Sequence, residues 1–395
     1  MLRRIALLVL TLLIAYPVAS RAQDFKVLSR EVQFHGWISQ GFVYTNQNNW
    51  LTMNTSSGSG AMTDMGLNVS SQLTDHFRVG AQVFDRNLGQ LGQYHPSLDW
   101  AVAEYNFKPW LNFRGGKVKT VIGLFNDTQD QDFLHTFALL PQSIYPIDLR
   151  DATAAHSGGD VYGSVSLPNR LGDLAYTVYA GHRNDSIYSG YPYLLTQYDV
   201  HYTQFGGLQY GADLRWRTPV KGLLLGASRL DQDTSAKGTI LGLPVEEHSR
   251  QDWTNQFYGE YSRGRFQIDS EYRRFFRDQI IFSGNAVDKD NIHGWYVSGT
   301  YRFTRRFQLG SYYSRYTITS PFEGSNDTSV PGLHDYDKVV TGNITINSFV
   351  NLKIEGHFMD GYADAPYPDG FYRQVNLQGF KPNTNALVLT TSFKF

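Results

Sequence analysis

From about Val32 to the end of the chain, short segments alternate apolar with polar residues, which is the two-residue period of a β-strand. Sixteen such segments follow one another, each of ten to fourteen residues. A very short break follows every even-numbered segment, and a polar break of roughly ten to thirty-four residues follows every odd-numbered one. The predicted strands are residues 33–46, 61–73, 76–86, 97–107, 111–124, 159–168, 173–183, 205–218, 221–231, 250–262, 265–277, 292–303, 306–318, 335–347, 350–361 and 384–395.

This rhythm of connections restricts the fold more than any single strand does. An even number of antiparallel strands, joined by short turns at one end and longer loops at the other, is typical of barrels that span the bacterial outer membrane. A soluble β-sandwich also alternates strands and turns, but its geometry does not require long and short connections to alternate strictly. The chain is therefore predicted to be all-β, with residues 23–395 forming a transmembrane antiparallel β-barrel of about sixteen strands.

The two faces of the predicted strands agree with a membrane-spanning wall. In residues 265–277, Phe266, Ile268 and Tyr272 share one face, and the other face carries mainly charged and amide side chains. Sixteen strands enclose a cylinder roughly 30–35 Å across, which side chains alone do not fill. Since the polar face is also too highly charged for a packed core, we expect the apolar face to meet lipid and the polar face to meet water.

Composition supports the same interpretation. Aromatic residues make up 15% of the chain and charged residues only 18%, while the mean hydropathy is −0.36 and no apolar run after Ala22 is long enough for a spanning helix. Aromatic residues beside the short breaks lie where an interfacial girdle is expected, although aromatic residues also favour strands in general. They are Phe77, Phe107, Trp110, Trp216, Tyr261, Phe266, Phe303, Phe307 and Phe349.

The first 22 residues are predicted to be a cleaved signal peptide. A short basic start is followed by an apolar run from Ile5 to Ala15, interrupted only by Thr11, and the small residues Ser20 and Ala22 suit a signal peptidase. A membrane anchor is the alternative, but the run is too short to cross about 30 Å of hydrocarbon as a helix. The remaining chain has 32 basic and 36 acidic residues and no cysteine, which argues against nucleic-acid binding and against a disulfide scaffold.

The last predicted strand ends in a pattern that resembles a known insertion signal. Leu387, Leu389, Thr391, Phe393 and Phe395 occupy alternate positions, and the chain ends on Phe395. Outer-membrane barrels carry a similar final strand with a terminal phenylalanine that is recognised during insertion. Together with the predicted signal peptide and the fifteen preceding strands, this strand indicates the outer membrane of a Gram-negative bacterium.

The longest connection, residues 125–158, is the third of the long ones. It begins with acidic residues, continues with an apolar stretch from Phe133 to Leu140, and ends with Pro141 to Asp151. A connection this long without regular structure is unusual in a compact domain. Its apolar middle is better explained by packing against the inner wall of the barrel than by exposure to solvent, and an external lid is the alternative.

A family resemblance gives this connection a role. Residues 114–126 are similar to the segment that precedes the constriction loop in several porin-like families, including the phosphate-selective porins. Those proteins often have proline where this chain has Val121, and the constriction-loop motif of the best-known enterobacterial porins is absent from the sequence. The resemblance implies a passive, water-filled channel for small polar solutes and ions, a third loop folded into the lumen, and a homotrimer in the lipid of the outer membrane.

Charged residues on the polar faces are the candidates for lining such a channel. By alternation, the wall supplies Arg78, Lys117, Lys119, Arg265, Arg273 and Arg277. The loop supplies Asp127, Asp130, Asp132, Asp148 and Asp151. A basic wall opposite an acidic loop sets up a transverse field in which polar solutes align. The alternative is that these charges only solvate a wide lumen and pair with one another.

Motifs of enzymes are weak or missing. Residues 115–118 lack the earlier glycine and the following Ser or Thr of a phosphate-binding loop, and no Gly-x-Ser-x-Gly or His-Glu-x-x-His pattern occurs. Residues 181–184 lack the nearby serine of outer-membrane phospholipases. We therefore expect no enzymatic activity, no metal and no cofactor. The alternative to a channel is a surface-interaction barrel, such as an adhesin or phage receptor, that acts through its long outer loops.

Overall fold

The computed structural model describes residues 23–27, 30–284, 286–319, 327–363 and 369–395. The predicted signal peptide, residues 1–22, lies outside them. Within these described residues, no helix is both long enough and apolar enough to cross a membrane.

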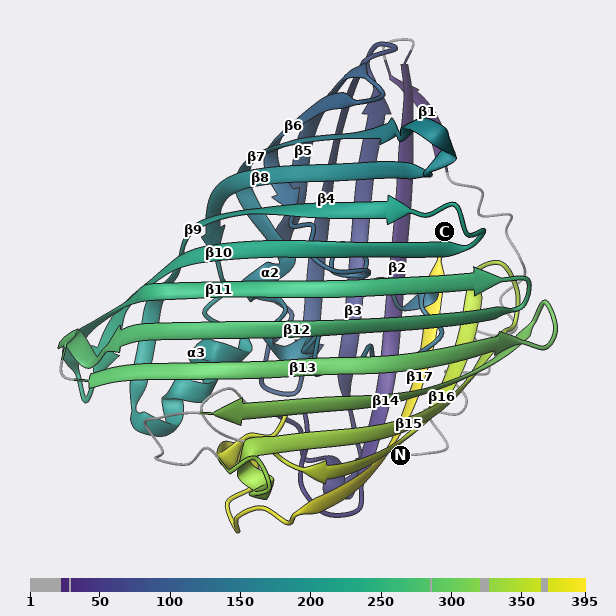
Figure 1. Cartoon of the computed structure of the whole chain (residues 1–395). Helices are drawn as coiled ribbons and strands as arrows, with labels where there is room; N and C mark the ends of the chain where they lie inside the picture. The colour runs from purple at the N-terminus through teal and green to yellow at the C-terminus, as the bar shows by residue number, and fades with distance from the viewer. Residues whose placement is uncertain (1–22, 28–29, 285, 320–326, 364–368) are drawn as a thin grey trace.

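Sixteen antiparallel strands form a closed barrel (Figure 1). Each strand pairs with the next along the chain, and the last pairs with the first, from Ala386 opposite Thr45 to Lys394 opposite Trp37. The predicted all-β barrel and its strand number are therefore confirmed. The strands are β2 (Arg30–Thr45), β3 (Ser59–Gln72), β4 (Phe77–Leu88), β5 (Ser97–Lys108), β6 (Leu111–Lys119), β7 (Ala155–Ser166), β8 (Asp173–Asn184), β9 (Val200–Arg217), β10 (Leu223–Ile240), β11 (Leu243–Arg263), β12 (Phe266–Ile281), β13 (Ala286–Arg302), β14 (Phe307–Thr319), β15 (His334–Thr345), β16 (Val350–Gly361) and β17 (Asn383–Lys394).

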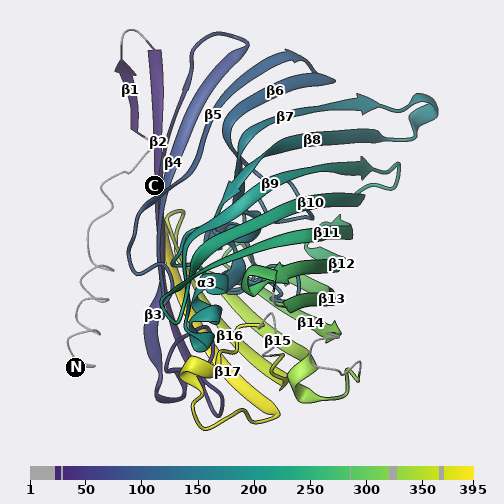
Figure 2. The same ribbon diagram turned by 90° about the vertical axis from the view of Figure 1, so that its left-hand side faces the viewer.

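A short additional strand, β1 (Gln23–Val27), pairs with the start of β2. It lies on the side of β2 that β17 occupies further along, and Figure 2 shows it beside the beginning of β2. Phe395 pairs with β2 next to the part of β2 that β1 covers. The backbone groups of Gly36 and Phe395 exchange two hydrogen bonds of 3.2 and 3.0 Å. This strand is not among the sixteen predicted ones.

Short helices occur only in the connections of the described chain. The α-helices are α2 (Asp151–Ala154) and α3 (Gly190–Leu195). The 3₁₀-helices are η1 (Thr55–Ser57), η2 (Asp132–Leu134), η3 (Ile147–Leu149), η4 (Pro168–Arg170), η5 (Thr196–Tyr198), η6 (Phe282–Gly284), η7 (Pro331–Leu333) and η8 (Arg373–Val375). None of these helices lies within a strand, so the wall of the barrel consists of strands alone.

Two of the predicted long loops are continuations of strands. β10 and β11 extend to a two-residue turn at Leu241 and Gly242, and β12 and β13 stay paired as far as Ile281 opposite Ala286. Near the first tip, the Lys237 ammonium lies 3.1 Å from a carboxylate oxygen of Glu246 on the exposed face, whereas Ala236 and Val245 are buried in an apolar cluster. Backbone pairing therefore continues past the predicted ends of these strands. The prediction that every odd-numbered strand is followed by a long loop was wrong at these two places.

The outward faces of the strands are apolar and the inward faces are charged. On β12, Phe266, Ile268 and Tyr272 are 40%, 36% and 37% exposed, whereas Asp269 and Glu271 are only 5% and 2% exposed. A soluble protein places these residue types the other way round. The arrangement is that of a wall with lipid outside, as the strand pattern predicted.

The absence of cysteine from the sequence allows single cysteines to report the orientation of the barrel. Leu241→Cys, at a hairpin tip where Leu241 is 77% exposed, is expected to react with a membrane-impermeant maleimide on intact cells. Val220→Cys, in a short turn at the other end of the barrel, is expected to react only after the outer membrane is permeabilised. The opposite labelling pattern would reverse the orientation.

Candidate channel and inner loop

The connection between β6 and β7, residues 120–154, is called the inner loop here because it contacts inward-facing side chains on several sides of the barrel. Arg86 of β4 donates to the carbonyl oxygen of Ile147 over 2.6 Å. Arg273 of β12 donates to the carbonyl oxygen of Ile144 over 2.7 Å, and Ser314 of β14 bonds to the hydroxyl group of Ser143 over the same distance. The loop begins and ends slightly earlier than predicted, since β6 ends at Lys119 and β7 begins at Ala155.

Two buried charged residues of β16 hold the apolar middle of the inner loop. Glu355 accepts the backbone N–H groups of Ala138 and Leu139 over 2.8 and 3.0 Å. The ammonium group of Lys353 donates to the side-chain and carbonyl oxygens of Asp132 over 2.9 and 2.5 Å. Both side chains have no exposed surface, so protein groups satisfy their charges: the loop for Lys353, and the loop together with His357 at 3.0 Å for Glu355. Removing either side chain leaves buried polar groups without partners, which is costly.

Four charged groups hold the base of the inner loop. Lys119 lies 2.9 Å from Asp99 and 2.8 Å from Asp130, and Arg150 lies 2.5 Å from Asp99 and also forms two hydrogen bonds with Asp130. Burial opposes the ionisation of Asp130, but Arg150 and Lys119 outweigh it and lower the pKa of this carboxyl group well below its usual value. The cluster therefore stays ionised and joins the loop to β5 and β6.

Glu271 of β12 gathers four donors. Its carboxylate accepts the hydroxyl groups of Tyr145 and Tyr296 over 2.6 and 2.9 Å. It also accepts the backbone N–H of Leu124 over 3.1 Å and the side-chain amide of Gln256 over 2.6 Å. The loop approaches this group closely, because a Cβ atom added at Gly123 would lie only 2.0 Å from the amide nitrogen of Gln256. Glycine is the residue that fits at this position.

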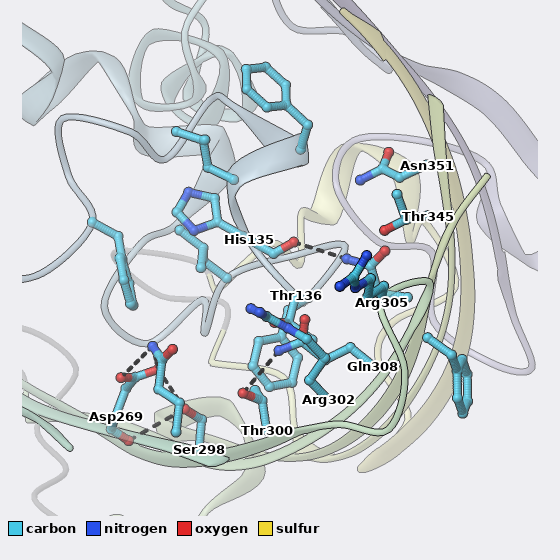
Figure 3. Close-up of a pocket in the computed structure, with 18 of the residues that line it drawn as sticks. His135, Thr136, Asp269, Ser298, Thr300, Arg302, Arg305, Gln308, Thr345 and Asn351 are labelled. Atoms are coloured by element: carbon cyan, nitrogen blue, oxygen red, sulfur yellow. Dashed lines mark hydrogen bonds between the residues drawn. The ribbon is translucent and has the colours of Figure 1, made fainter. Parts of the chain in front are cut away.

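Two cavities lie on either side of the Glu271 cluster. The larger, of about 530 Å³, is bordered by Tyr296 and by short-turn residues such as Arg305, which Figure 3 labels. His135 and Thr136 of the inner loop border it opposite Arg302 and Gln308 of the wall. The smaller cavity, of about 90 Å³, is bordered by Tyr145 and by residues of the long connections. Since Tyr145 and Tyr296 share the carboxylate of Glu271, the narrow region between the cavities is made of loop and wall together.

Three other predicted site residues have partners of different kinds. Asp148 accepts the hydroxyl group of Tyr372 over 2.6 Å, and Asp151 begins α2 with its carboxylate 3.6 Å from the Arg150 guanidinium. Arg277 donates to the hydroxyl group of Tyr191 in α3 over 2.6 Å. The predicted site residues of the inner loop and of the wall thus take part in several separate contacts and do not form one cluster.

Arg78 and Arg265 lie at the short-turn end of the barrel. Arg78 is 3.8 Å from Glu104 and half of its side chain is exposed. Arg265 belongs to the turn before β12 and donates to the carbonyl oxygen of Phe303 over 3.1 Å. Neither residue contacts the inner loop in the hydrogen bonds and ion pairs of the described chain, so both lie apart from the narrow region.

Lys117 of β6 does not join the cluster at the base of the inner loop. It stands opposite Ala101 of β5 and Ser157 of β7, and its ammonium group donates to the carbonyl oxygen of Leu98 over 2.6 Å. No hydrogen bond or ion pair of the described residues joins Lys117 to the inner loop, so its place in the lumen stays a prediction.

Sequence reasoning missed three residues that position the loop. Arg86 pairs with Asp64 over 2.7 Å as well as with the loop, Arg150 belongs to the loop itself, and Asp99 lies at a register shift in β5. Only acidic residues were considered in the loop, which excluded Arg150. The irregular pairing of β5 breaks the two-residue alternation at Asp99, so no periodic signal marks its side chain as inward.

The inner loop contains a histidine that titrates at low pH. Burial lowers the pKa of His135 to about 4, and its Nε2–H donates to the carbonyl oxygen of Thr128 over 2.9 Å. A pKa below the unfolded value of about 6.5 means that the stability it contributes is present above pH 6.5 and is lost as the pH falls through 4. His135→Gln keeps a donor but cannot ionise.

Wild type is therefore expected to lose several degrees of its thermal midpoint relative to His135→Gln between pH 7 and pH 4, measured in detergent by circular dichroism. His76→Gln, at an exposed short turn, serves as the matched control and should follow wild type. Equal pH responses of wild type and His135→Gln would show that His135 remains neutral in this range or is not held by the loop.

Solved structures with the same architecture cover nearly the whole chain. The outer-membrane-expressed OmpT of Vibrio cholerae is similar with a TM-score of 0.57 and 12% sequence identity, over 94% of this chain and 100% of that one. The outer membrane channel DcaP of Acinetobacter baumannii has a TM-score of 0.56 and 12% identity over 94% and 99% of the two chains. An anion-selective porin from Comamonas acidovorans has a TM-score of 0.54 and 10% identity over 93% and 100%.

Sequence comparison alone is silent, since no protein-family model and no curated protein matches the chain. The likeness therefore lies in the course of the backbone, and at such low identity it concerns the fold. This chain has the sixteen-stranded barrel fold of the outer-membrane porins.

Proposed function

We propose that the chain forms a passive, water-filled diffusion channel for small polar solutes and ions in the outer membrane of a Gram-negative bacterium. The observation that carries this proposal is the pair of cavities on the two sides of the Glu271 cluster, enclosed by a wall that is charged inside and apolar outside. A packed barrel with only a structural role has no need of charged inner faces. The narrow region at Phe125, Tyr145 and Tyr296 is the proposed constriction.

The charged residues divide into two groups under this proposal. Lys119, Asp130 and Asp132 hold the inner loop through ion pairs. Because these charges are paired, they act on solutes only through the part of their electric field that their partners do not cancel. Asp127 and Arg273 form no ion pair within the described residues, so they are the stronger candidates for acting on a passing solute. We also propose a homotrimer, as described for one form of OmpT from Vibrio cholerae.

A surface-interaction barrel remains the second candidate, and one observation favours it. β9 to β13 are 16 to 21 residues long, whereas β5 to β8 are 9 to 12 residues long, so one side of the barrel extends further (Figure 1). The extended hairpins give a partner, such as a phage or a host surface, a regular edge to bind. Such a role does not require the lumen to conduct.

Electrical recording separates the two candidates. Purified protein is reconstituted in a planar lipid bilayer bathed in potassium chloride solution. It is expected to add conductance in steps, with current proportional to voltage, because ions cross a water-filled lumen without any gating transition. Correct folding is checked in the same sample by circular dichroism and heat-modified gel mobility. Folded protein that leaves the bilayer silent would contradict the channel and favour the surface-interaction barrel.

The field of the inner loop is tested at Asp127, which is half-buried and stands apart from the ion pairs that fix the loop. Asp127→Asn is expected to shift the reversal potential in a salt gradient toward anions, because one negative charge leaves the proposed constriction. The shift should shrink at high salt, where the screening length falls to ~3 Å at 1 M. Glu246→Gln, at an exposed hairpin tip, is the matched control. Equal shifts in both variants would place Asp127 away from the conducting path.

A further inference from the structure

The smaller cavity has a divided lining. One part is an apolar cluster formed where Phe275, Ile292 and Tyr316 of the wall meet Leu149 of the inner loop and Tyr191 of α3. The other part carries charge, and its cations are Arg183, Arg273 and Arg277. Apolar and aromatic surface inside a polar lumen is unexpected for a space that has only to pass water and ions. This combination is typical of a site for an organic solute.

Arg273 differs from five other arginines of the barrel, each of which has a carboxylate partner. Its Nη1 donates to the carbonyl oxygen of Ile144 over 2.7 Å, but within the described residues it forms no ion pair and its Nε has no hydrogen-bond partner. By contrast, each of the following arginines has a carboxylate of its own: Arg86 with Asp64, Arg114 with Asp160, Arg150 with Asp130, Arg183 with Asp185, and Arg215 with Asp213. Burying half of a guanidinium group without a carboxylate partner costs free energy unless an anion binds to it. The paired N–H donors of the guanidinium group match the two oxygens of a carboxylate.

The acidic residues around the cavity do not supply that anion. Asp185 lies 2.9 Å from Arg183, and Asp252 accepts the hydroxyl group of Thr234 over 3.1 Å. Burial, together with the neighbouring Asp148, raises the pKa of Asp369 well above its usual value, which disfavours its ionised form. The Oδ1 atom of Asp369 has no hydrogen-bond partner among the described residues. Asp369 is therefore a weak competitor for Arg273.

The size of the cavity limits the ligand. It measures about 90 Å³, and a single water needs about 10–15 Å³ on the same measure, so a ligand of roughly six to nine heavy atoms fits. A dicarboxylate of this size would press its second charge against Phe275 and Tyr316, which is unfavourable. An uncharged solute would leave Arg273 without an anion. One charge on a compact apolar body matches both parts of the lining.

We propose that this cavity binds small monocarboxylates with an aromatic or compact apolar body, placing the carboxylate on Arg273 and the body against Phe275 and Tyr316. The inference rests on the proposed function, because it names these acids as the class of solute that the channel takes up preferentially. The smaller cavity lies on the side of the Glu271 cluster where the long connections are. Binding there would concentrate these acids at the outer side of the proposed constriction.

Calorimetric titration of the purified full-length protein in detergent tests this proposal with benzoate as the probe. Benzoate is expected to bind at a single class of sites, and benzyl alcohol and succinate to bind at least about tenfold more weakly. Arg273→Gln is expected to weaken benzoate binding about tenfold or more, because a charge-assisted pair is lost. Arg274→Gln is the matched control, since Arg274 is the next residue and bonds to Asn291 on the outer face.

A second variant guards against a general loss of structure. Phe275→Ala is expected to weaken benzoate binding strongly but to leave the weaker binding of acetate nearly unchanged, because only the apolar contact is removed. Equal affinity for benzoate in wild type, Arg273→Gln and Phe275→Ala would overturn the site. Potassium chloride conductance is recorded for the same samples, so a conducting wild type that does not bind benzoate contradicts this inference alone. A silent protein that binds benzoate contradicts the channel but supports the site.

Discussion

Every backbone group of a membrane-spanning wall has to find its partner within the wall, because hydrocarbon offers none. The pairing of β17 with β2 meets this requirement, since it leaves none of the strands from β2 to β17 with an open side. The rest of the structure depends on that closure. Half of the wall's side chains then face lipid, and the other half face an enclosed space that is too wide for them to fill.

The inner loop fills part of this space and has the same need for backbone partners. Regular structure does not supply them, because η2, η3 and α2 are each three or four residues long. The wall supplies them instead: Glu355 and Glu271 accept backbone N–H groups of the loop, and Arg86 and Arg273 donate to its carbonyl oxygens. Charged residues on the inner face thus have a structural duty as well as an effect on solutes.

The sequence predicts the wall well because the wall is a local pattern. Two-residue alternation and turn length are visible in any short stretch, and they located sixteen strands and their short turns. Features that depend on pairing were not visible in this way. The hydrogen bond of Lys117 to Leu98 depends on the pairing of β6 with β5, and the hairpin of β10 and β11 continues past the predicted strand ends through backbone pairing. The partners of Asp132 include Lys353 and Ser392, which belong to strands far away in the sequence.

The position of β1 and of Phe395 has a consequence for assembly. The seam of the barrel joins the first part of the chain to its last residues, with Trp37 opposite Lys394 and Gly36 bonded to Phe395. Closing the ring is therefore the least local event in folding, and its chain entropy cost is paid before its hydrogen bonds are gained. The inner loop, which comes much earlier in the chain, has to be enclosed by the time the seam shuts. The moment at which the C-terminal strand pairs with β2 therefore decides when the inner loop becomes enclosed in the lumen.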